Sequence, residues 1–296
     1  MPTPLLSQGR IAVLPDLGHR TLIMGILNVT PDSFSDGGQF DGLGKALAHA
    51  DLMIGEGADI IDIGGESTRP GHSPVSVETE IARISPVIAT LAKRISQPIS
   101  IDTYKAATAR AALQLGAKIV NDIWGLQREP EIAHVAADFG APVIAMHNRE
   151  TVDASLDILD EMRRFFDQSI RIARKAGIRD TDIILDPGIG FGKSRKQELD
   201  ALHRIADLKA LGYPVLVGAS RKSFIGRLIA SPQLQEATQG VAQVEPKDRL
   251  IGSIAAHVLA IAGGADMIRV HDVRAHVEAI RVTDAIMASA ATPSLA

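Results

Sequence analysis

Residues 21–38 read Thr-Leu-Ile-Met-Gly-Ile-Leu-Asn-Val-Thr-Pro-Asp-Ser-Phe-Ser-Asp-Gly-Gly, and the pattern of this stretch recurs along the whole chain. Its first part, residues 22–27, is apolar on both faces, which is typical of a strand buried in a parallel sheet. The composition becomes polar at Asn28, and Pro31 ends the strand because proline has no amide hydrogen to donate. The stretch therefore predicts a buried strand whose carboxyl end leads into a polar loop.

The same change from an apolar run to a polar loop occurs eight times, each time followed by a helical pattern. We expect strands at residues 22–27, 59–65, 98–101, 118–120, 142–146, 182–185, 213–217 and 266–272. We expect helices at residues 44–56, 77–95, 104–115, 130–139, 155–176, 195–211, 249–263 and 273–288. Strands joined by crossover helices are parallel. Eight such units predict an α/β fold of the (β/α)8 TIM barrel type. A doubly wound open sheet is the alternative, but no Gly-x-Gly-x-x-Gly turn follows the first strand.

Composition narrows the class of protein. The 296 residues are 46% hydrophobic but only 3% aromatic, so aliphatic packing must fill the core. The net charge of −4 offers no basic surface for nucleic acid, and the absence of cysteine excludes disulfides and thiolate chemistry. We find no apolar run of membrane-spanning length and no signal peptide before about Gly9. We expect one cytoplasmic domain, 1–296, with the barrel at about 20–288, a surface insertion at 230–247 and a tail at 289–296.

Polar side chains stand where the expected strands end. They are Asn28, Thr68, Arg69, Asp102, Asn121, Asp122, His147, Asp186, Ser220, Arg221, Lys222, Arg269 and His271. Any one of them could simply cap a helix or lie in solvent. All strand ends of a parallel barrel, however, open on the same face. The set therefore predicts one site for a polar ligand.

The chemistry of these residues indicates three subsites. Asp102, Asn121 and Asp186 are acceptor-rich and suit a flat heterocycle with many N–H donors. Strands eight and one become neighbours when a barrel closes, and they bring together Asn28, Arg269 and His271. Arginine and histidine favour an oxyanion, and an amide oxygen can ligate a Mg²⁺ that accompanies a diphosphate. Residues 220–222 are expected to open a helix whose amide groups favour a carboxylate or phosphate.

Five sequence blocks resemble the signatures of the dihydropteroate synthases, in the order of that family. They are residues 24–38 quoted above, DIGGESTRPG at 62–71, DPGIGFGK at 186–193, GASRKSFIG at 218–226 and RVHDV at 269–273. The resemblance extends from about residue 20 to 288. It implies that 4-aminobenzoate displaces pyrophosphate from (7,8-dihydropterin-6-yl)methyl diphosphate, with Mg²⁺ as the cofactor. It also implies a homodimer and a place in a family that sulfonamides inhibit. The charge and hydropathy described above predict no nucleic-acid or membrane partner.

The resemblance also implies a role for each matched residue. Asp102, Asn121, Asp186 and Lys222 hold the pterin, and Asn28, Arg269 and His271 hold the diphosphate, with Asn28 as the metal ligand. Phe34, Thr68, Arg69, Pro70 and Ser220 border the aminobenzoate. Met146, Phe191 and Gly218 complete the substrate-binding set, and the residues implied to be catalytic are Asn28, Asp102, Lys222, Arg269 and His271.

The fifth loop departs from the family pattern. The family has Met-His-Met-x-Gly-x-Pro there, whereas in this chain Met146 and His147 are followed by Asn-Arg-Glu-Thr-Val at residues 148–152. Two other functions are considered: a paralogue that binds pterin without turnover, and a pterin-dependent methyltransferase. The diphosphate-type residues Asn28 and His271 argue against both.

We predict from the loop sequences that ligands bind in order. Residues 30–38 and 66–72 have little apolar surface with which to dock on the barrel, so we expect them to close only over a bound diphosphate. Closure would bring Phe34 and Pro70 together as walls for the benzene ring, with its carboxylate near Ser220. Calorimetry should show tighter binding of 4-aminobenzoate when pyrophosphate and Mg²⁺ are present. Equal affinity with and without pyrophosphate would contradict this role of the loops.

Overall fold

The computed structural model describes residues 11–30, 39–67, 74–230 and 244–291. Within these ranges strands and helices alternate as expected. The strands are β1 Leu22–Asn28, β2 Ile60–Gly64, β3 Ile99–Asp102, β4 Ile119–Asp122, β5 Val143–Met146, β6 Ile183–Asp186, β7 Leu216–Val217 and β8 Met267–Val270. The helices are α1 Gln39–Glu56, α2 Val77–Leu91, α3 Ala106–Gln114, α4 Glu131–Asp138, α5 Ile158–Ala176, α6 Arg195–His203, α7 Ile205–Lys209, α8 Ser223–Ile229, α10 Leu250–Ala262 and α11 Val273–Ala291. The 3-10 helices η3 Asp180–Asp182 and η4 Pro246–Arg249 precede β6 and α10.

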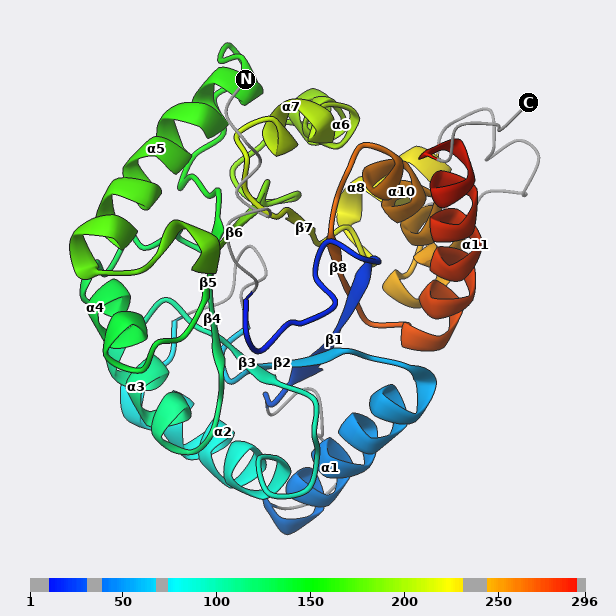
Figure 1. Cartoon of the computed structure of the whole chain (residues 1–296). Helices are drawn as coiled ribbons and strands as arrows, with labels where there is room; N and C mark the ends of the chain where they lie inside the picture. The colour runs from blue at the N-terminus through cyan, green and yellow to red at the C-terminus, as the bar shows by residue number, and fades with distance from the viewer. Residues whose placement is uncertain (1–10, 31–38, 68–73, 231–243, 292–296) are drawn as a thin grey trace.

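The eight strands form one parallel sheet in the order β6-β5-β4-β3-β2-β1-β8-β7. The two ends of the sheet meet where Leu185 bridges Val215, and the Leu185 amide donates to the Pro214 carbonyl at 2.9 Å. Figure 1 shows the helices surrounding the strands on the outside. The predicted (β/α)8 barrel is confirmed, and the open doubly wound sheet is wrong.

The two faces of each strand pack in different places, because successive side chains point to opposite sides. Outward residues such as Ile61, Ile101 and Val120 pack against the helices. Inward residues at the amino ends form a second apolar cluster, here called the plug. The plug consists of Ile11, Leu14, Leu17, Leu22, Met24, Ile60, Ile119, Ile144, Ile184, Leu216 and Met267.

Above the plug the inward-facing residues become polar. In β2, the polar residue Asp62 lies two positions after the plug residue Ile60. The same step leads from the plug to Asn121 in β4, Asp186 in β6 and Arg269 in β8. The barrel interior is therefore divided into an apolar lower half and a polar upper half at the carboxyl ends of the strands. This division places the functional site.

Several predicted boundaries are wrong for local reasons. The helix expected at 195–211 is two helices, because Arg204 has φ −104° and ψ 28° and interrupts the helical path. The helix expected from 104 begins at Ala106, since Lys105 is extended (φ −97°, ψ 122°). The strand expected at 213–217 pairs with β8 only at Leu216–Val217. The fifth helix begins at Ile158 rather than 155, where the Asp157 carboxylate caps the amides of the first turn.

None of the helices in the described ranges combines the length and hydropathy needed to cross a lipid bilayer.

Candidate active site

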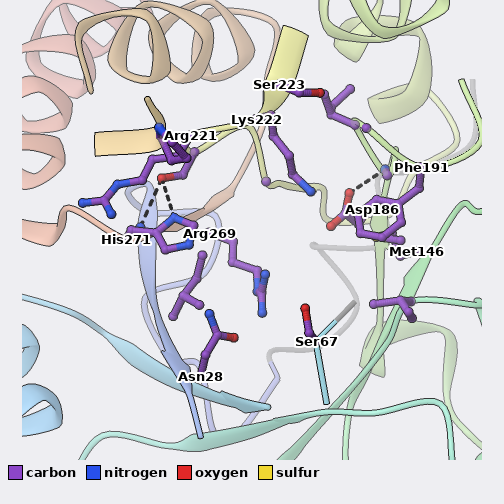
Figure 2. Close-up of a pocket in the computed structure, with 18 of the residues that line it drawn as sticks. Asn28, Ser67, Met146, Asp186, Phe191, Arg221, Lys222, Ser223, Arg269 and His271 are labelled. Atoms are coloured by element: carbon purple, nitrogen blue, oxygen red, sulfur yellow. Dashed lines mark hydrogen bonds between the residues drawn. The ribbon is translucent and has the colours of Figure 1, made fainter. Parts of the chain in front are cut away.

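A cavity of about 520 Å³ opens at the carboxyl ends of the strands. Ten of the residues implied to bind substrate or metal line it: Asn28, Asn121, Met146, Asp186, Phe191, Gly218, Ser220, Lys222, Arg269 and His271. Arg221, also expected at this face, lines it as well. Figure 2 shows Asn28 and His271 on one side and Asp186, Phe191 and Met146 on the other, with the Lys222 side chain between the two groups. The expectation that these strand ends form one site is met for these ten.

A buried ion triplet is part of this site. The guanidinium of Arg269 donates through Nε to Asp62 Oδ2 and through Nη2 to Asp102 Oδ2, both at 2.6 Å. Asn121 Nδ2 donates to the same Asp62 oxygen at 3.2 Å. All three ions are buried or nearly so, because the Arg269 side chain is only 18% exposed and both acids less. Arg269 thus links the acidic side of the site to the side of Asn28 and His271.

The triplet leaves acceptor atoms unused. Asp62 Oδ1 and Asp102 Oδ1 are buried, and no described residue donates to either. Burial raises the pKa of Asp102 to about 7, partly opposed by Arg269 and reinforced by Asp62. Buried acceptors without donors are costly unless a ligand supplies the missing N–H groups. Asp102 lies at the end of β3, where its Oδ2 accepts from Arg269, a residue that lines the cavity.

Asp186 forms the acidic wall opposite. Its Oδ1 accepts the Gly188 amide at 2.7 Å, while burial raises its pKa to about 6. Burial and the charge of Arg269 lower the pKa of Lys222 to about 8. The Lys222 ammonium lies 4.2 Å from the centre of the Phe191 ring. A flat, neutral ligand in this part of the cavity would therefore contact the Asp186 carboxylate, the Lys222 ammonium and the face of the Phe191 ring.

Loops after β5 and β6 are locked together beside this wall. Gly188 has φ +62°, and a Cβ there would lie 1.9 Å from the His147 carbonyl oxygen, so only glycine fits. Lys193 Nζ donates to the Gly188 and Phe191 carbonyls at 2.8 and 3.1 Å and to His147 Nδ1 at 2.7 Å. Burial lowers the pKa of Lys193 to about 7. This loop bracing explains why the divergent residues after His147 leave Met146 in the cavity wall.

The opposite wall combines Ser220 with His271. Ser220 Oγ lies 3.0 Å from His271 Nδ1 and accepts the His271 backbone amide at 3.2 Å. Burial and the nearby charges of Arg221 and Arg269 lower the pKa of His271 to about 3. His271 is therefore a neutral imidazole at physiological pH. It can hydrogen-bond an oxyanion, but it adds no positive charge until that anion binds.

The donor set limits how Mg²⁺ could bind. Within the described ranges no group of three or more acidic or histidine side chains could hold a metal ion. Asn28 lines the cavity and offers one neutral oxygen. Mg²⁺ commonly takes one or two protein ligands and fills the remaining positions with phosphate oxygens and water. Asn28 therefore fits Mg²⁺ only as the companion of a bound diphosphate.

Not every predicted residue can be placed. Phe34, Thr68, Arg69 and Pro70 lie outside the described residues, as do the loop stretches 31–38 and 68–73. The prediction of ordered binding therefore stays a prediction.

One local expectation is wrong. The helix expected to open at residue 220 begins at Ser223, and Arg221, which has φ +57°, already donates its amide to Ser253 Oγ at 2.9 Å. Most of the predicted surface insertion at 230–247 lies outside the described residues, so it stays a prediction, and Pro246 near its end lines the cavity with Arg249.

Sequence reasoning missed Asp62 and Lys193 as site residues. Asp62 was read only as part of a buried strand, although a single carboxylate inside the apolar run Ile60–Ile63 is itself an unusual signal. Lys193 ends a glycine-rich loop, and a lysine at that place is most simply read as solvated. Only the fold shows that its ammonium is buried against three acceptors.

We predict that Asp62→Asn destabilises the fold. The change removes the charge of one partner of Arg269, while Asp102 still neutralises the guanidinium, so we expect the loss of a charged buried hydrogen bond, about 1–3 kcal/mol. Urea denaturation should show that loss in the free energy of unfolding. Asp51→Asn removes a surface partner of Arg94, whose two side chains are 45% and 47% exposed, and should change stability by less than about 1 kcal/mol. Equal effects of the two changes would contradict the importance given to the triplet.

Comparisons with known proteins agree with this geometry. A model of the pterin binding enzyme family matches residues 24–271. Dihydropteroate synthase from Synechocystis is 48% identical over 277 residues, covering 92% of this chain and 92% of that protein. A crystal structure of dihydropteroate synthase from Clostridium difficile, in the presence of pteroic acid, is 50% identical with a TM-score of 0.85, covering 92% of this chain and 98% of that one. The Yersinia pestis dihydropteroate synthase, solved with a sulfonamide drug, is 41% identical with a TM-score of 0.81, covering 92% and 95%. With identities at this level over nine-tenths of the chain, and a cavity of buried acceptors on a (β/α)8 barrel, the chain belongs to the dihydropteroate synthase family of pterin binding enzymes.

Proposed function

We infer that this protein is a dihydropteroate synthase, a transferase that joins (7,8-dihydropterin-6-yl)methyl diphosphate to 4-aminobenzoate. The amine nitrogen forms a bond to the pterin methylene carbon, the bond from that carbon to the diphosphate oxygen breaks, and pyrophosphate leaves. The nitrogen then loses one proton to solvent. The observation that carries the inference is a cavity in which the Asp186 carboxylate stands opposite the anion-binding groups Asn28 and His271. Arg269, which also lines it, is held by Asp62 and Asp102, and the second oxygen of each acid has no donor among the described residues.

The acidic side of the cavity suits the pterin. The pterin amino group and ring N–H groups are donors in one plane, and Asp102, Asn121 and Asp186 are acceptors from three neighbouring or nearby strands. Met146 and Phe191 supply apolar surface beside them. Lys222 can donate to the pterin carbonyl, because its buried ammonium lies over the Phe191 ring inside the cavity. Every polar edge of the heterocycle then has a partner after desolvation.

The opposite side suits the diphosphate. Asn28 and His271 face the cavity there, and Arg269 extends from beside His271 towards the middle of the cavity (Figure 2). The reaction develops charge on the leaving diphosphate, so fixed donors aimed at it lower the barrier. Mg²⁺ bound with the diphosphate would add positive charge at this place, with Asn28 as its protein ligand. Ser220, beside His271, is placed for the carboxylate of 4-aminobenzoate. We propose that sulfonamides occupy the same place, as the Yersinia pestis relative was solved with such a drug.

The test is the release of pyrophosphate from the pterin diphosphate, measured with and without 4-aminobenzoate. We expect release that depends on both 4-aminobenzoate and Mg²⁺. Asp186→Ala should weaken pterin binding by about 2–4 kcal/mol because ligand donors lose a buried acceptor. Asp138→Ala removes an exposed carboxylate on α4 and serves as the control. A wild-type protein that binds pterin but releases no pyrophosphate would be a binding paralogue, and the inference would be wrong.

We predict that pterin affinity falls as the pH falls. The pKa values of Asp102 and Asp186 are raised to about 7 and about 6 in the empty site. An ionised carboxylate can accept N–H groups on both oxygens, whereas protonation turns one of them into a donor, so the ligand favours the deprotonated form and affinity is greatest above about pH 8. Below pH 6 each titrating group should weaken binding by up to about tenfold per pH unit. Calorimetry between pH 5 and 8 with a pterin lacking the diphosphate would show this, and Asp102→Asn should remove the upper step. A flat profile would exclude these two acceptors.

We propose that the protein is a homodimer formed by α10 and α11. Ile251 and Leu259 on α10 are 83% and 69% exposed, and Val282 and Ile286 on α11 are 61% and 62% exposed. The two helices pack against each other (Figure 1), so these residues form one apolar surface of the kind that commonly meets a second copy. Sedimentation should give a mass of about twice 31.4 kDa. Ile251→Glu with Leu259→Glu should give a monomer, while the exposed Leu52→Glu on α1 should not; a wild-type monomer would contradict the proposal.

We also propose a cytoplasmic location, supported by a composition without cysteine and hence without the disulfides common outside the cell.

A further inference from the structure

Behind the wall of the cavity, two buried histidines connect the loops that follow β7 and β8. The Ala219 amide donates to His257 Nε2 at 3.0 Å, and His257 Nδ1 lies 3.0 Å from His276 Nε2. His276 Nδ1 lies 2.7 Å from the Asp272 carbonyl oxygen. His257 is on α10 and His276 is on α11, and each is about 1% exposed. Neither lines the cavity, and the function proposed above uses neither.

The two ends of this hydrogen-bonded series, the Ala219 amide and the Asp272 carbonyl, fix the direction of every hydrogen bond between them. A backbone amide can only donate, so His257 Nε2 must be unprotonated and its Nδ1 must carry the hydrogen. That hydrogen points to His276 Nε2, which must then accept. The remaining hydrogen of His276 lies on Nδ1 and is donated to the carbonyl of Asp272, which can only accept. Both imidazoles are therefore neutral, and each is held in the Nδ1–H tautomer.

The surroundings favour the neutral form. Burial lowers the pKa of both histidines, and the neighbouring His276 lowers that of His257 further, whereas Asp272 opposes the shift of His276 only in part. The charged and titratable groups nearby are His271, Asp272 and Arg221, of which the last two form a bidentate ion pair at 2.9 and 2.5 Å. The Val217 carbonyl lies close to His257 as well. It would accept from the opposite tautomer, but the Ala219 amide would then face an N–H group.

We propose that His257 and His276 are positioning residues for the anion-binding wall formed by Ser220 and His271. Ala219 immediately precedes Ser220, and Asp272 immediately follows His271. The histidine pair fixes both backbones from behind, and the Ser220–His271 contact at 3.0 Å joins them at the cavity. The pair therefore fixes the distance between the two loops that receive the carboxylate and the diphosphate. The inference rests on the proposed function for the identity of those ligands.

The first experiment measures the tautomers in the unaltered protein. Nitrogen-15 NMR of the histidine side chains between pH 6 and 8 should show His257 and His276 neutral, protonated on Nδ1 and unaffected by pH. His134, which is exposed on α4 and outside this chain of hydrogen bonds, serves as the internal control. A charged His257, or one protonated on Nε2 and bonded to Val217, would overturn the proposal without any variant.

The second experiment compares His257→Leu with His257→Gln. Leucine fills the space but accepts nothing, so we expect KM for 4-aminobenzoate to rise about five- to tenfold. Glutamine can accept the Ala219 amide and donate to His276, so it should restore at least half of that loss. Binding of a pterin without diphosphate should change less than twofold, because its acceptors lie on other strands. His134→Leu should leave all values unchanged.

Equal losses for both ligands in a folded His257→Leu protein, or no rescue by glutamine, would show that the pair has only a structural role. An inactive wild-type protein would instead contradict the proposed function. In that case the tautomers, measured without substrate, would still test the histidine chain itself.

Discussion

Arg269 shares one guanidinium between Asp62 and Asp102, and this buried pairing allows polar residues to occupy the upper half of the barrel. Charges removed from water are costly unless they are paired and hydrogen-bonded. Two carboxylates around one arginine leave an excess of acceptors over donors inside the site. The free oxygens of Asp62 and Asp102 therefore suit a ligand rich in N–H groups, such as a pterin.

The site depends on a second layer of polar contacts that touches no ligand in our proposal. Lys193 holds the carbonyls of the β6 loop and the imidazole of His147, so the loops after β5 and β6 move as a unit. Lys105 makes comparable contacts beside β2, where its Nζ donates hydrogen bonds to Glu66 and Glu80. Loops rich in glycine and serine cannot anchor themselves by apolar packing, and buried hydrogen bonds replace it.

The two walls of the cavity differ in charge because their neighbours differ. Asp186 stands among backbone amides and near Lys222, so it can ionise close to neutral pH. His271 stands among arginines, so it stays neutral and gains a proton only at a pH well below that of the cell. One side of the site is thus prepared for a donor-rich heterocycle and the other for an incoming anion. The reaction proposed here needs both sides within one cavity.

The sequence by itself determined the barrel and the position of the site around its mouth. Apolar runs that end in polar loops and alternate with helices predict parallel strands buried on both faces, and eight such units favour a closed barrel over an open sheet. It did not determine the partners of buried charges. Asp62 and Arg269 are 207 residues apart, and Lys193 and His147 are 46 apart, so no local pattern links them. Closure of the barrel brings the two residues of each pair together. Because they are buried there, either one without its partner would be costly. The tautomers of His257 and His276 were decided in the same way, because only the tertiary structure places a backbone donor at one end of the pair and a backbone acceptor at the other.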